Sequence, residues 1–182
     1  MSEEVRVLQI QYNRVHFLLN REQCSAGFFA SRVSPLKSRL RYLNQLLETD
    51  EGRLLFFDLH RFWTDTFRID CEEESQLAVI ARTDLYREPT RDLLATQVFP
   101  RLHHLKIATD RLAFRISANT SMRTITPDQL KLHSPVVQQH MINRGVLAVH
   151  PTSDSMGFFI DLEFLLCTKS LFAVSPRSRE QS

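Results

Sequence analysis

Amide side chains gather on residues 134–144, a segment with the sequence of a helix. Gln138, Gln139 and Asn143 are residue types whose side chains can form paired hydrogen bonds with the edge of an adenine base. A recognition helix of this kind lies in the major groove of DNA with its N-terminal part toward the bases. An ordinary solvated helix face is the alternative interpretation of the same three residues.

Basic residues before, beside and after this segment could contact phosphate groups. The segment carries little positive charge of its own, so we expect contacts to the DNA backbone and shape to dominate, with little sequence preference. His150 stands at the start of an expected hairpin that follows. The predicted DNA-binding residues are Arg115, Arg123, Lys131, Gln138, Gln139, Asn143, Arg144 and His150.

The charge of the chain is unevenly distributed, although the formal net charge is only +2. Residues 100–150 contain 7 Lys and Arg against 2 Asp and Glu. A basic face of this size suits a polyanionic partner. A solvated surface explains the same imbalance equally well.

Residues for catalysis or for binding a metal are not arranged in a recognisable pattern. Cys24, Cys71 and Cys167 are odd in number and far apart, which is neither a disulfide framework nor a metal-ligand spacing. His133 and His140 could share a helix face, but no cysteine lies nearby to complete a site. The chain has only 4 glycines and no glycine-rich nucleotide loop. We therefore expect no enzyme activity, no cofactor and no metal.

The order of elements in the second half is typical of a winged helix. A proline-started helix is predicted at residues 125–130, and a second begins at Ser134-Pro135 and stops at Gly145. Strands are predicted at residues 146–149 and 156–160, with a turn between them. Two helices joined by a short turn and followed by a hairpin form a helix-turn-helix with a wing.

The first half shows a similar order. Leucines at helical spacing predict a helix from Ser34-Pro35 to residue 47, and residues 54–63 predict another. Residues 67–70 and 77–81 are expected to be strands on either side of the acidic turn 72–75. Residues 5–19 fit either a strand that enters a helix or one short helix.

These orders predict an α+β fold made of tandem winged-helix domains. The expected domains are residues 1–87, an N-terminal winged-helix-like unit, and residues 88–174, a C-terminal winged-helix unit. The polar residues 175–182 are expected to be a disordered tail. No segment approaches the length of a membrane span, and no secretory signal is expected at the N-terminus.

Four stretches of the second half match a known pattern: TDLY at 83–86, LATQVFP at 94–100, VQQHMINRGVLAV at 137–149 and GFFI at 157–160. With the apolar segment that follows, they resemble the family named serine/threonine-protein kinase nineteen. The resemblance implies tandem winged helices that act as a DNA-binding scaffold in the nucleus, in transcription-coupled DNA repair. The kinase in that name has no support here, because the catalytic loops of protein kinases are absent.

The predicted function is therefore a non-enzymatic protein that binds double-stranded DNA and acts as a scaffold in a nuclear DNA repair or transcription complex. Its expected partners are duplex DNA and the proteins of a multisubunit complex, without a membrane. The expected location is the nucleus, with the cytoplasm as the alternative. The alternative function is a winged-helix module for protein–protein interaction in a multisubunit assembly, with no nucleic-acid binding.

Overall fold

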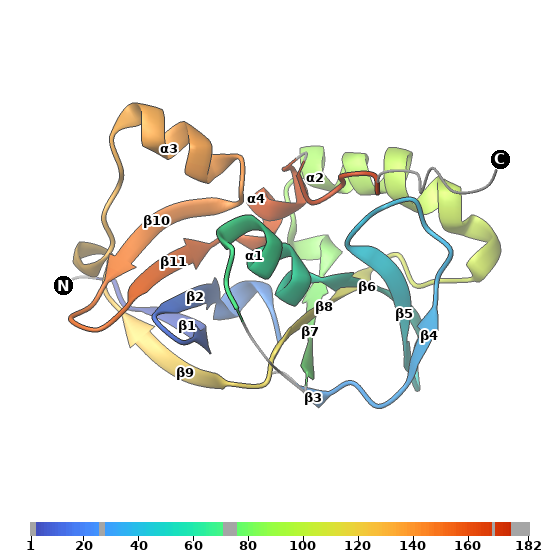
Figure 1. Ribbon diagram of the computed structural model, residues 1–182. Helices are drawn as coiled ribbons and strands as arrows, with labels where there is room; N and C mark the ends of the chain where they lie inside the picture. The colour runs from blue at the N-terminus through green and yellow to red at the C-terminus, as the bar shows by residue number, and fades with distance from the viewer. Residues whose placement is uncertain (1–2, 26–27, 71–75, 169, 176–182) are drawn as a thin grey trace, which may run out of the picture.

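Two β-sheets form the framework of the protein in a computed structural model that describes residues 3–25, 28–70, 76–168 and 170–175 (Figure 1). The first sheet has the order β10 (Val146–Pro151), β11 (Met156–Ile160), β2 (Val15–Asn20), β1 (Val5–Tyr12) and β9 (Thr120–Ile125). The second sheet has the order β3 (Phe28–Phe29), β7 (Gln76–Arg82), β8 (Arg111–Ser117), β6 (Gly52–Asp58), β5 (Leu43–Thr49) and β4 (Val33–Pro35).

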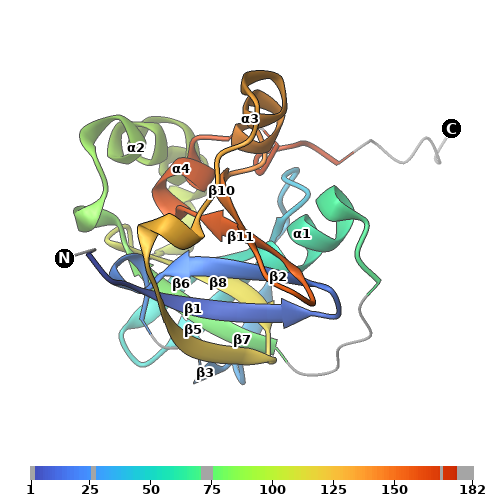
Figure 2. The same ribbon diagram turned by 90° about the vertical axis from the view of Figure 1, so that its left-hand side faces the viewer.

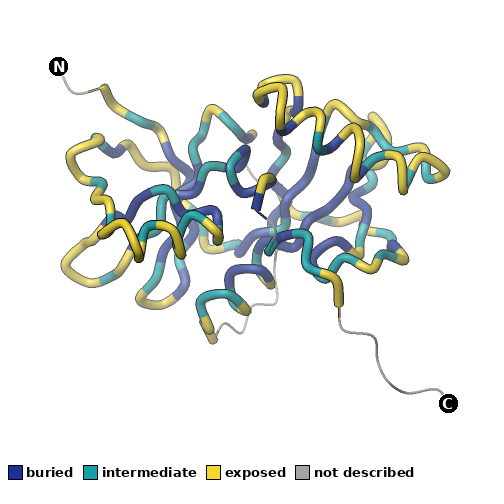
Figure 3. The backbone as a smooth tube through the Cα atoms, turned by 90° about the horizontal axis from the view of Figure 1, so that it is seen from above, coloured by how far each residue is buried: buried dark blue, intermediate teal, exposed yellow. Residues whose placement is uncertain are grey.

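The helices are short and lie around the sheets. Buried segments gather toward the middle of the molecule and exposed segments lie around them (Figure 3). In chain order the helices are η1 (Arg21–Gln23), α1 (Leu59–Phe67), η2 (Thr83–Leu85), α2 (Glu88–Leu93), η3 (Leu94–Val98), η4 (Phe99–Leu105), η5 (Pro127–Gln129), α3 (Pro135–Ile142) and α4 (Leu162–Leu166). In the described part of the chain, none of them is long and apolar enough to cross a membrane.

The N-terminal hairpin is the centre of the first sheet. β1 and β2 pair antiparallel, and each has a second neighbour from far along the chain: β9 pairs with β1, and β11 runs parallel to β2. A central strand has side chains buried on both faces, so its sequence reads as a continuous apolar run that resembles a buried helix. This is why residues 5–19 were compatible with a helix although they form two strands.

The second sheet also buries both of its faces. Leu46 and Leu55 belong to the main core, whereas Leu47, Leu54 and Phe56 form a smaller cluster on the opposite side. The leucines of residues 36–47 therefore occur at spacings that imitate a helix, and the predicted helix there is wrong. β4 ends at Pro35 and β5 begins at Leu43, with a connection between them, and a register shift in β5 further obscures the alternation expected of a strand.

Helix α1 connects the two sheets. It follows directly from β6 of the second sheet, and the Asp58 carboxylate caps its start by accepting a hydrogen bond from the Arg61 backbone N–H at 2.9 Å. Its Trp63 ring then packs on Phe17 of the first sheet. The main core contains residues from both sheets and from this helix, so the sheets share one hydrophobic interior.

The winged-helix fold is wrong for both halves. The β10–β11 hairpin is not a free wing, because β11 pairs with β2 along its other edge. The helix expected at residues 125–130 is only the three-residue η5, so no helix-turn-helix forms. In the first half, residues 52–58 are a strand, and β7 pairs with β3 and β8 instead of a strand at residues 67–70.

The expected domain boundary between residues 87 and 88 falls between β7 and β8. These two strands pair along seven residues, from Gln76 with Ser117 to Arg82 with Arg111. The first sheet is likewise built from both ends of the chain. The acidic turn 72–75 and residues 176–182 of the expected tail lie outside the described residues.

Several local predictions are confirmed. Of the helix predicted at residues 90–106, residues 90–105 are helical through α2, η3 and η4, and residues 77–81 and 114–116 lie within strands β7 and β8. The Ser134-Pro135 helix start and the two strands that follow it also form as expected. The exit helix is shorter than residues 162–172 and ends at Leu166.

Candidate protein-interaction surface

Helix α3 is an exposed helix next to the first sheet. Pro135 occupies its first turn and fixes the backbone angle there, yet none of its residues is buried. Figure 2 shows α3 standing above β10 at the top of the molecule. An eight-residue helix is marginal in water by itself, so contacts with the rest of the fold must hold it.

Gln138 supplies one of these contacts. Its side-chain oxygen accepts a hydrogen bond from the His133 backbone N–H at 3.1 Å, and its side-chain nitrogen donates to the Leu147 carbonyl at 2.9 Å. The amide thus ties the start of α3 to β10. Because both ends of the Gln138 amide are used within the protein, it is not a free recognition group.

Gly145 ends the α3 segment and fits it onto α4. Its φ of +78° lies in the left-handed region, which confirms the predicted C-terminal stop. A Cβ at this position would meet Leu165 Cδ1 at 2.5 Å, so the backbone approaches α4 closely. The Ser170 hydroxyl also donates to the Asn143 carbonyl at 2.8 Å.

Apolar side chains on and before α3 point into solvent. Leu132 and Val136 are each 76% exposed, and Val137 is 43% exposed. We call these three residues the α3 ridge. Large apolar side chains that cluster at the surface mark sites where another molecule is bound. The sequence does not indicate which way Val136 and Val137 face, and only the attachment of α3 to β10 shows that they face outward.

A pocket of about 540 Å³ lies between α3 and α4. We call it the α3–α4 pocket. Its lining residues are Ile142, Asn143, Phe164, Cys167, Thr168 and Ser170. The pocket is a mainly apolar hollow at the C-terminal end of α3.

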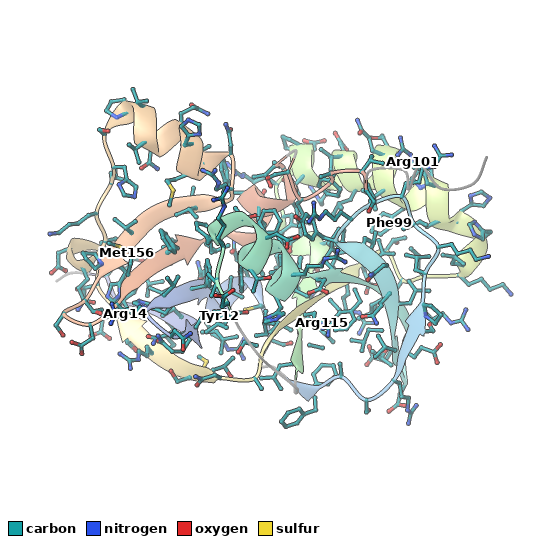
Figure 4. The ribbon with its side chains drawn as sticks, in the orientation of Figure 1. Tyr12, Arg14, Phe99, Arg101, Arg115 and Met156 are labelled. Atoms are coloured by element: carbon teal, nitrogen blue, oxygen red, sulfur yellow. The ribbon has the colours of Figure 1, made fainter. Side chains whose placement is uncertain are left out.

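The predicted DNA-binding residues do not share one face. Arg115 lies on β8 of the second sheet, well away from α3 (Figure 4), and its guanidinium pairs with the Asp58 carboxylate at 3.1 Å. Arg123 lies on β9 beside a separate polar pocket that also contains His16. Around α3 the structure gathers Lys131, Gln139, Asn143 and Arg144, besides the engaged Gln138.

His150 is buried in a hydrogen-bonded chain and does not face a partner. Its Nδ1 lies 3.1 Å from His16 Nε2, and His16 Nδ1 lies 2.8 Å from the Ser155 hydroxyl. Gly157 leaves the room for this chain, since a Cβ there would come within 2.1 Å of His16 Nε2. Burial, together with the nearby His150 and Arg123, lowers the pKa of His16 to about 4. Burial also lowers the pKa of His150.

The chain is similar to a solved structure described as the scaffolding protein TtCheW from Thermoanaerobacter tengcongensis. The two share 12% of their residues with a TM-score of 0.60, over 91% of this chain and 89% of that chain. The chain has a CheW-like fold. No family model matches the sequence, and no curated protein matches it. An identity this low shows the fold alone.

The CheW-like fold corrects the resemblance to the serine/threonine-protein kinase nineteen family, which was wrong. The four matching stretches form η2, the helical segment of η3 and η4, α3 with β10, and β11, which are local elements that this β-rich fold also contains. The expectations that depended on winged helices are therefore wrong as well: DNA binding, a role in nuclear repair or transcription, and location in the nucleus. The eight predicted DNA-binding residues lie on α3, on the first sheet and on the second sheet, and this separation agrees with the correction.

Proposed function

We propose that this protein is a non-enzymatic adaptor that binds other proteins in a multisubunit assembly, with the α3 ridge and the α3–α4 pocket as the contact surface. The observation that carries the proposal is the 76% exposure of both Leu132 and Val136 on a segment held in place by hydrogen bonds. The likeness in fold to a protein described as a scaffold supports it.

The energetics of the ridge favour a protein partner. Full burial of a valine or leucine side chain stabilises a complex by roughly 1.5–3 kcal/mol. Three such side chains on a fixed helix can form the centre of a small interface, because the helix needs little additional ordering when it binds. The α3–α4 pocket, at the C-terminal end of the same helix, offers a hollow for a side chain of the partner.

Two side chains of types that act in catalysis, Cys24 and His16, are held in unreactive states, which supports a role without catalysis. Burial raises the pKa of the Cys24 thiol to about 11, so little of the nucleophilic thiolate is present at neutral pH. His16, with its pKa lowered to about 4, uses both ring nitrogens within the protein. Among the described residues, no three or more His, Cys, Asp or Glu side chains are grouped to hold a metal ion.

Site-specific photo-crosslinking in cells tests the proposal. A photoreactive amino acid replaces Val136 in one strain and Ala95, an exposed residue on η3, in the control strain. We expect a protein to be cross-linked at position 136 and not at position 95. The cross-linked protein is then identified by mass spectrometry and purified.

Calorimetric titration of the purified partner completes the test. Val136→Asp is expected to weaken binding at least tenfold because it places a charge in the centre of the contact, while its melting temperature stays near that of the wild type. Equal cross-linking at both positions, or equal affinity of the variant, would contradict the proposal.

A further inference from the structure

We infer that the α3 ridge binds an acidic amphipathic helix of a partner protein. The inference rests on the proposed adaptor function and specifies the chemistry of the partner. Its basis is the combination of an exposed apolar centre with unpaired positive charge at both ends.

The charge around the ridge has one sign. Residues 129–153 contain no Asp or Glu, whereas Lys131 and Arg144 stand on either side of α3. Within the described ranges, neither residue forms an ion pair, and the Arg144 guanidinium donates only to the His140 backbone carbonyl, at 3.4 Å. Both cations are therefore available to carboxylates of a partner.

The two cations are held at defined places. Lys131 exchanges two backbone hydrogen bonds with Val149 of β10, at 2.8 and 2.9 Å, which fixes the start of its side chain before Leu132. Arg144 lies in the turn after α3, immediately before Gly145. A helix of eight residues is about 12 Å long, so the cations stand at the two ends of a surface that matches two to three turns of a partner helix.

The chemistry of such a partner follows from this arrangement. Helices that dock in this way present apolar residues at positions i, i+3, i+4 and i+7. Here the apolar stripe would contact Leu132, Val136 and Val137, and glutamates beside the stripe would reach Lys131 and Arg144. Complementary charges at the rim mainly raise the association rate and select the partner.

Other occupants fit less well. A second copy of this chain, docked symmetrically through the same ridge, would bring Lys131 and Arg144 close to their own equivalents, so like charges would oppose the contact. A polyanion without apolar groups would satisfy the cations but leave Leu132 and Val136 without favourable contacts. Both possibilities are separated by the experiment below.

The experiment uses two synthetic 18-residue helical peptides with the same leucine stripe. One carries glutamate beside the stripe and the other carries lysine, and a poly-glutamate peptide of the same length is the control without apolar groups. Affinity for the full chain is measured by fluorescence anisotropy at several salt concentrations, and the oligomeric state of the chain by light scattering. We expect the acidic peptide to bind at least tenfold more tightly than the lysine peptide at low salt, with the difference shrinking as salt increases.

Two variants locate the binding. Lys131→Glu combined with Arg144→Glu is expected to reverse the preference between the peptides, whereas Arg91→Glu combined with Arg101→Glu changes the net charge equally at exposed positions outside α3 and should leave the preference unchanged. Val136→Asp is expected to remove binding of the acidic peptide. Thermal melting confirms that each variant is folded.

Three outcomes would overturn the inference, and they differ from failure of the adaptor function. Equal binding of the acidic and lysine peptides, with loss in Val136→Asp, would leave an apolar docking surface without the charge selection. Binding of poly-glutamate as tight as that of the acidic peptide would show a site for charge alone. Dimers that depend on Val136 would identify a second copy as the occupant. The adaptor proposal fails separately, through cross-linking that does not depend on position 136.

Discussion

The ring of Trp63 lies flat against the ring of Phe17, with their centroids 4.2 Å apart and their planes at 6°. Phe17 belongs to β2 of the first sheet, and Trp63 belongs to the helix that follows β6 of the second sheet. Both side chains are fully buried. This contact therefore holds together two sheets whose strands come from different parts of the chain.

Removing the Trp63 ring should weaken the packing between the two sheets and so lower the stability of the fold. Trp63→Ala is expected to lower the free energy of unfolding by about 3–5 kcal/mol, because it leaves a large cavity beside Phe17. Trp63→Phe should cost much less, since the indole Nε1 has no hydrogen-bond partner to lose within the described residues. Urea unfolding measures both values, and equal losses in the two variants would show that the ring contact does not stabilise the junction.

Acid should weaken the fold through His16. Its pKa is about 4 in the folded protein against about 6.5 in an unfolded chain. Because the unfolded state takes up the proton first, the stabilising contribution is complete above pH 6.5 and is lost as the pH falls from 6.5 toward 4. Chemical unfolding at pH 7.5 and pH 5 should show this loss. His16→Asn should flatten the dependence, while the exposed-site control His103→Asn should retain it; a wild-type stability that does not change between the two pH values would refute the argument.

Alanine at Gly145 is expected to destabilise the α3–α4 region. The positive φ of +78° strains any L-residue, and the added Cβ would collide with Leu165. Gly52→Ala is a control for backbone strain without crowding, because Gly52 has a φ of +129° but no atom within 4 Å of the added Cβ. Its φ lies further than that of Gly145 from the left-handed region that L-residues adopt, so its strain is the larger of the two, whereas only Gly145→Ala adds crowding. Thermal melting should therefore show a loss in both variants, and a Gly145→Ala protein that melts with the wild type would contradict both the strain and the crowding at this position.

The ion pair between Arg115 and Asp58 should make a measurable contribution to the stability of the fold. The Asp58 side chain is 9% exposed and the Arg115 side chain 26%, and the carboxylate also caps α1. A double-mutant cycle with Arg115→Ala and Asp58→Ala is expected to give a coupling energy of about 1–3 kcal/mol. The exposed pair between Arg32 and Asp50, at 3.4 Å, should give less than about 1 kcal/mol. Similar values for the two pairs would argue that burial does not strengthen the first.

The elements of the second half of the chain were easier to predict, because proline and glycine residues mark where several of them begin and end. Ser134-Pro135 and Gly145 control backbone angles within a few residues, so they determined where α3 starts and where its segment stops. Residues 151–155 likewise separate two strands that pair with each other. What these signals could not show is that β11 also pairs with β2, whose residues are more than 130 positions earlier.

The charge of the candidate surface could be predicted from the sequence, but the direction of its apolar side chains could not. Lys131 and Arg144 were recognisable as a charged region without acids, and both lie beside α3. The direction of Val136 was not, because a short helix with two valines at its start is compatible with either an inward or an outward face. Its exposure depends on the hydrogen bonds of Gln138 to His133 and Leu147, which join α3 to β10 along one side.

By itself the sequence determined the local events: where α3 and β10 begin, the left-handed stop at Gly145, the strand at residues 77–81, and the positive charge without acids around residues 129–153. Only the tertiary structure decided that Leu43, Leu46 and Leu47 form a strand, and that residues 5–20 lie between β9 and β11. The physical reason is that sheets buried on both faces erase the alternation that distinguishes a strand from a helix. Their partners are then selected by contacts between residues far apart in the chain, which no local pattern records.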